Sequence, residues 1–102
     1  MARYLEGKAV YVIGAGNEQH RGVAVALAEA GANIAVGGPR SDLAAEAALH
    51  SIANEIWALS RRSTVVVLED SSPTAFATAV NQVTTELGRA DLVVRCDDVA
   101  NA

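Results

Sequence analysis

The chain has 102 residues, of which 51% are hydrophobic and only 4% aromatic, and its formal net charge is −4. This length supports one partial domain over residues 1–102 and excludes a second one, and the scattered Lys and Arg residues form no basic stripe for a nucleic acid. No apolar run reaches the roughly 18 residues of a membrane span, and the start has no signal sequence. We therefore expect a soluble, cytoplasmic protein that binds neither nucleic acid nor membrane.

The first half of the chain alternates between a strand pattern and a helix pattern. A β-branched run over 8–13 predicts a strand, and apolar residues at helical spacing over 23–30 predict a helix that stops at Gly31. The next apolar run, over 33–36, predicts a second strand, which the turn residues at 37–39 should close.

The same alternation continues in the second half. Ser41 can cap a helix with one apolar stripe, which consists of Leu49, Ile52, Ile56 and Leu59. The nearly pure Val run over 64–68 predicts a third strand, and Ser72 followed by Pro73 is typical of a helix start. The stripe of this third helix consists of Phe76, Val80, Val83 and Leu87, and Gly88 follows it.

A fourth apolar run over 91–94 completes the order β-α-β-α-β-α-β. Apolar strands that alternate with helices predict a parallel sheet covered on both faces, which is a three-layer α/β fold of the Rossmann type. In such sheets a ligand binds beyond the carboxyl ends of the strands. The loops to consider are therefore 14–20, 37–41, 69–72 and 95–102.

Several segments match one known family in order and spacing, without an insertion. These segments are 5–16, 26–32, 69–73 and 86–91. Together they make the chain resemble the N-terminal half of short-chain dehydrogenases/reductases. The resemblance implies a Rossmann half-domain of an oxidoreductase that binds NADP or NAD. It also implies that the family's catalytic Ser, Tyr and Lys lie downstream of the fourth strand, so we expect no catalytic residue within these 102.

The glycine motif of that family is altered in this chain. The resemblance places its three glycines at Gly14 and at positions 18 and 20, where Glu18 and His20 stand instead. A carboxylate at a helix N-terminus would repel the phosphates that this position attracts. If the loop still binds a dinucleotide, the binding residues are Gly14, Gly16, Asn17, Glu18 and Arg21. In the alternative, Glu18 caps its own helix in place of a phosphate.

Arg21 could balance Glu18 through an ion pair, reach a phosphate, or be a solvated arginine. We expect His20 to be a packed or surface histidine, because no carboxylate or nucleophile has a fixed relation to it.

Arg40 follows the second strand, where NAD-preferring relatives usually carry an acidic residue. The resemblance therefore implies a preference for NADP, with the Arg40 guanidinium on the 2′-phosphate, although a plain surface arginine is the alternative. Glu69 or Asp70 stands where the family's adenine contact is expected. Either residue could instead begin the turn before Ser72.

The family's Asn-Asn-Ala-Gly stretch is replaced after the fourth strand by Arg95, Cys96, Asp97 and Asp98. The two aspartates add negative charge beside a pyrophosphate and lack further ligands for a metal site. Cys96 is expected to be inert. A competing function is a non-catalytic scaffold or interaction module that has lost dinucleotide binding. A half sheet also leaves an exposed edge, so we expect a homo-oligomer formed through that edge.

Overall fold

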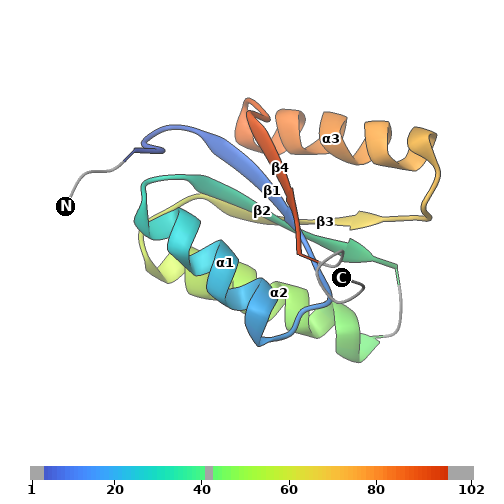
Figure 1. Cartoon of the computed structure of the whole chain (residues 1–102), viewed down its shortest axis with the longest axis horizontal. Coiled ribbons are helices and arrows are strands. Elements are labelled where there is room, and N and C mark those ends of the chain that lie inside the picture. The colour runs from blue at the N-terminus through green and yellow to red at the C-terminus, as the bar shows by residue number, and fades with distance from the viewer. Residues whose placement is uncertain (1–3, 41–42, 97–102) are drawn as a thin grey trace.

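The computed structural model describes residues 4–40 and 43–96, and it confirms the predicted element order. The elements are β1 (Ala9–Ile13), α1 (Glu18–Glu29), β2 (Asn33–Pro39), α2 (Leu43–Ala58), β3 (Ser63–Leu68), α3 (Pro73–Leu87) and β4 (Leu92–Arg95). All strand pairs are parallel, and the strands lie in the order β3-β2-β1-β4. Helices α1 and α2 cover one face of the sheet and α3 covers the other (Figure 1). The three-layer Rossmann-type α/β fold is therefore confirmed.

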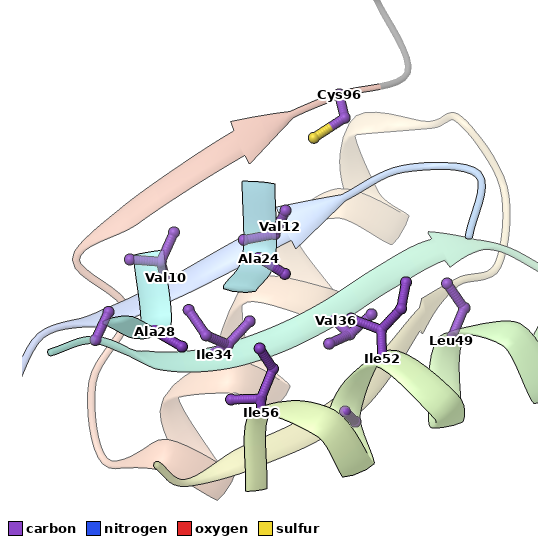
Figure 2. Packing of buried hydrophobic residues seen from close by; sticks show 12 residues of the cluster. Val10, Val12, Ala24, Ala28, Ile34, Val36, Leu49, Ile52, Ile56 and Cys96 are labelled. Atoms are coloured by element: carbon purple, nitrogen blue, oxygen red, sulfur yellow. The ribbon is translucent and has the colours of Figure 1, made fainter. Parts of the chain in front are cut away.

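Strand β1 lies in the interior of the sheet, and all five of its residues are buried. Because successive side chains point to opposite faces, Val10 and Val12 pack in the layer of α1 and α2, whereas Tyr11 packs in the layer of α3. Figure 2 shows Ala24 of α1 beside Val12, and Ala28 beside Val10. These small side chains let α1 lie close against the sheet, which fixes the loop between β1 and α1.

Strand β2 runs to Pro39 and does not end at residue 36, so the predicted closure by Gly37 was wrong. Gly37 pairs with Ile13, and Pro39 pairs with Leu68. The buried ring of Tyr11 lies directly over Gly37, where a Cβ atom would collide with it. Gly37 is therefore a packing position inside the strand.

The Tyr11 hydroxyl donates a hydrogen bond to the carbonyl oxygen of Val66 at 2.9 Å. Burial raises the pKa of Tyr11 to about 12, against a lowering effect of Arg95. The phenol therefore ties β1 to β3 across the α3 face of β2 and stays neutral at ordinary pH.

The ends of α3 agree with the prediction. Ser72 Oγ accepts the backbone N–H of Ala75, Pro73 opens the helix, and Gly88 ends it with a φ of 86°. Leu59 does not belong to the stripe of α2, because that helix ends at Ala58 and Leu59 is 38% exposed in the turn that follows. The predicted cap Ser41 lies outside the described residues. Within the described ranges no helix is long and apolar enough to cross a membrane.

Candidate functional site

The loop between β1 and α1 is closed by its own polar groups. Asn17 Oδ1 accepts the backbone N–H of His20 at 3.0 Å, so Asn17 is the N-cap of α1. The interpretation in which Glu18 caps the helix is therefore wrong. Glu18 occupies the first helical position, where its side chain is 90% exposed and lies 3.6 Å from Arg21. Its carboxylate still stands at the helix end that would attract an anion.

His20 points inward, which agrees with the expectation of a packed histidine. Apart from Tyr11, whose phenol hydroxyl is also buried, it is the one fully buried side chain with polar ring or hydroxyl groups in the described core. Its Nδ1 accepts the N–H of Gly16 at 3.0 Å, and its Nε2 lies 2.9 Å from the carbonyl oxygen of Val12. Because Nδ1 accepts, Nε2 must carry the proton and donate to Val12, which defines a neutral ring. The ring fills the space that a side chain at Gly14 would need, since a Cβ there would lie 2.6 Å from Cγ of His20.

Arg21 makes its main interaction with another helix. Its Nε and Nη2 donate to the two carboxylate oxygens of Glu55 in α2, both at 2.7 Å. Glu55 raises the pKa of Arg21, first through the hydrogen bonds and then through its charge, with a smaller contribution from Glu18. A two-pronged guanidinium–carboxylate contact of this kind fixes the side chain in one direction. Arg21 therefore joins α1 to α2 in this structure.

Arg40 and Glu69, from the ends of β2 and β3, bind each other. The Arg40 Nε and Nη2 atoms donate to the two Glu69 oxygens at 2.7 and 2.6 Å, and Nη1 lies 3.5 Å from Glu46 of α2. The hydrogen bonds from Arg40 lower the pKa of Glu69. Asp70 accepts the N–H of Ser72 at 2.7 Å, so it begins the turn before α3 as the alternative interpretation had it.

A pocket of about 190 Å³ opens at the carboxyl ends of β1 and β2. It is lined by Gly14, Ala15, Gly38, Pro39, Ala45 and Leu49. The two strands approach so closely here that a Cβ on Gly38 would lie 2.7 Å from the Gly14 carbonyl oxygen. The floor is therefore bare backbone, and Arg40 follows the rim residue Pro39 directly.

The segment after β4 is described only as far as Cys96. The Cys96 N–H donates to the Ile13 carbonyl at 2.7 Å, and its side chain is 7% exposed. Figure 2 shows it above Val12, in the apolar cluster of the α1 and α2 layer. Asp97 and Asp98, predicted to add charge at this edge, lie outside the described residues. Among those described, no group of three or more His, Cys, Asp and Glu residues could hold a metal ion.

The structure thus gathers the described site residues at one edge of the sheet, but it engages them within the protein, Arg40 with Glu69 and Arg21 with Glu55. Sequence reasoning missed Glu55 and Glu46 as partners and did not foresee that His20 would take the Gly16 amide. The contact between Arg40 and Glu69 could have been inferred from the sequence, since parallel neighbouring strands place the residues after their ends side by side. The direction of His20 had no comparable signal.

Comparison with known proteins gives a result only at the level of structure. No protein-family model matches the sequence, and the search of curated proteins finds no match. A short-chain type dehydrogenase/reductase from Mycobacterium marinum is 31% identical with a TM-score of 0.74, and the match covers 89% of this chain and 35% of that one.

Two further similar structures were solved with a cofactor. A short-chain dehydrogenase from Burkholderia cenocepacia J2315, in complex with NADP, is 28% identical with a TM-score of 0.73 over 87% of this chain and 35% of that chain. Carveol dehydrogenase from Mycobacterium avium, in complex with NAD, is 27% identical with a TM-score of 0.74, and the match covers 91% of this chain and 36% of that chain.

The parallel sheet and the loops at its carboxyl edge define a Rossmann-type fold. Its structural neighbours are short-chain dehydrogenases/reductases, which confirms the resemblance found in the sequence. The chain spans little more than a third of the length of the solved structures it matches, which is consistent with an N-terminal half of such a protein.

Proposed function

We propose that this chain is the NAD(P)-binding half of a short-chain oxidoreductase, with residues 1–102 forming one partial domain and NADP preferred to NAD. The observation that carries the proposal is the pocket of bare backbone between Gly14 and Gly38, with Arg40 at its rim. Neighbours solved with NADP and with NAD support a nicotinamide dinucleotide in general. The chemistry of the proposed enzyme would come from groups outside these residues.

Arg40 is the proposed contact for the 2′-phosphate. Its side chain is 52% exposed, and the two donors that now face Glu69 match the geometry of a phosphate as well as that of a carboxylate. A 2′-phosphate would therefore compete with Glu69 for the same atoms. NAD carries no such group and would leave the Arg40–Glu69 pair intact.

Isothermal titration of the chain with NADPH and NADH tests this proposal. NADPH should bind more tightly, Arg40→Gln should remove the difference, and Glu69→Gln should increase the affinity for NADPH by releasing Arg40. Arg62→Gln is the matched control, because Arg62 precedes β3 and donates to Glu86 at the amino-terminal edge of the sheet. Absence of binding by wild type and by all three variants would refute the proposal.

A non-catalytic scaffold or interaction module is the second candidate. It is favoured by the loop that closes on itself through Asn17 and His20. Within the described residues β4 is an edge strand, and its Leu92 and Val93 are 47% and 39% exposed. Exposed apolar side chains on an unpaired edge favour association, so we propose a homo-oligomer formed through β4.

Light scattering over a wide range of protein concentrations tests the oligomer. The mass should rise with concentration for the wild type and stay at that of a monomer for Leu92→Lys. A monomer at all concentrations for both proteins would contradict self-association. We also propose a cytoplasmic location, since Cys96 is buried and has no second cysteine in these 102 residues with which to form a disulfide, which suits a reducing compartment.

A further inference from the structure

We propose that the His20 imidazole takes the place of the pyrophosphate contact in the first loop, so that the site holds a nucleotide by its adenosine 2′-phosphate end alone. The inference rests on the proposed nucleotide-binding function and narrows its ligand class to adenosine 2′-phosphates. Affinity then comes from the pocket and Arg40, and the rest of a dinucleotide adds nothing.

Two backbone N–H donors of the loop are already bonded within the protein. A phosphate at a helix N-terminus is held by free N–H groups of the loop and the first helical turn. Here the Gly16 N–H is given to His20 Nδ1 at 3.0 Å, and the His20 N–H is given to Asn17 at 3.0 Å. These two donors would have to break internal bonds before they could face a ligand.

Packing and hydrogen bonds hold the His20 ring firmly in place. The ring is fully buried, bonded at both nitrogens, and within 3 Å of the Cβ position of Gly14 at three of its atoms. Withdrawing the ring would leave a void below Gly14 and remove the side-chain hydrogen bond to the Val12 carbonyl, and both are costly. The loop is therefore fixed in its closed form without any ligand.

The charge at the start of α1 also disfavours a pyrophosphate. Glu18 presents an exposed carboxylate at the first helical position, and Arg21 lies 3.6 Å from it while its two shorter bonds go to Glu55. The negative charge at this end of α1 is therefore only partly balanced. A pyrophosphate would meet repulsion where the helix dipole otherwise attracts it.

The pocket is small for a whole dinucleotide. Ligand sites that enclose a whole molecule usually measure about 300–1,000 Å³. The pocket between Gly14 and Gly38 measures about 190 Å³ and has one guanidinium at its rim, which suits one ring system and one phosphate. A nucleoside 2′-phosphate fits this description.

The test compares NADPH with adenosine 2′-monophosphate, which lacks a 5′-phosphate, by isothermal titration of the full chain. The dissociation constants of the wild type should agree within about fivefold. In a Glu18→Gly/His20→Gly double variant, NADPH should bind at least about tenfold more tightly than to the wild type, with the affinity for the monophosphate unchanged. Gln19→Gly is the matched control for adding glycine to the same turn at an exposed position, and it should change neither constant. NADPH binding to the wild type more than about fivefold tighter than the monophosphate would overturn the proposal.

Nuclear magnetic resonance keeps the proposal testable if the double variant does not fold. In the wild type, His20 should show a proton on Nε2 only, and the Gly16 amide signal should stay in place when NADPH is added. A proton on Nδ1, or a Gly16 amide signal that moves with NADPH and not with adenosine 2′-monophosphate, would overturn it. If no nucleotide binds and the His20 signals are as expected, the proposed function and the ligand class that rests on it are refuted. The closed form of the loop would then still be established.

Discussion

The buried phenol of Tyr11 gives the structure a measurable dependence on high pH. Its pKa is raised from 10.0 to about 12 by burial, so the folded chain holds the proton more tightly than the unfolded chain does. The stabilising contribution of the neutral phenol is complete below pH 10 and is lost as the pH rises towards 12. From these two values the free energy of unfolding of the wild type should fall by about 1.4 kcal/mol between neutral pH and pH 11.

The Tyr11→Phe variant separates this effect from general alkaline denaturation. At neutral pH the variant should be less stable by about 1 kcal/mol, because the hydrogen bond from the phenol to the Val66 carbonyl is lost. At pH 11 the difference should nearly vanish, since only the wild type ionises. Urea denaturation at pH 7, 9, 10 and 11 measures the free energy of unfolding of the wild type and of Tyr11→Phe, with Tyr4→Phe as the control at an exposed tyrosine. Parallel loss of stability by wild type and Tyr11→Phe above pH 10 would refute the reasoning.

Three further substitutions test packing and charge elsewhere. Gly37→Ala should destabilise the chain by roughly 1–3 kcal/mol in urea denaturation, because its Cβ would collide with the Tyr11 ring, and an unchanged midpoint would contradict the fit of ring on strand. Gly22→Ala should stabilise it by up to about 1 kcal/mol, since the added methyl group meets nothing within 4 Å in the middle of α1, and any loss would count against that open space. Hydrogen bonds from Arg89 and from the N–H of Ala9 lower the pKa of Asp91 from its ordinary value of 3.8. The Asp91 carboxylate therefore stabilises the fold above pH 3.8, and this contribution is lost as the pH falls below that value. Asp91→Asn should therefore lower the thermal midpoint at pH 7 and not at pH 2, and equal losses at both would contradict the assignment.

The order of the elements could be predicted because each strand is apolar throughout and each helix carries a stripe at helical spacing. A parallel sheet covered on both faces requires both patterns. The length of β2 could not be predicted from the sequence, because glycine commonly ends a strand. At Gly37 it continues the strand instead, since the partner that needs the missing side chain is Tyr11, from a different strand.

The candidate site was predictable in position and not in its internal contacts. That the relevant residues follow the carboxyl ends of strands is a property of parallel sheets and can be inferred from sequence order. The contact between Arg21 and Glu55 depends on how α1 and α2 lie beside each other, which no local pattern encodes. The inward direction of His20 likewise depends on a space under Gly14 that exists only in the folded loop.

The fit of His20 beneath Gly14 also bears on how such a loop can change over generations. Glycine at position 14 is required by a neighbour in the same chain, so it would persist even under relaxed selection for a ligand. The two positions form an epistatic pair: a larger residue at 14 becomes acceptable only after residue 20 has become smaller. A glycine retained at the start of such a loop can therefore record an internal constraint as well as an inherited binding function.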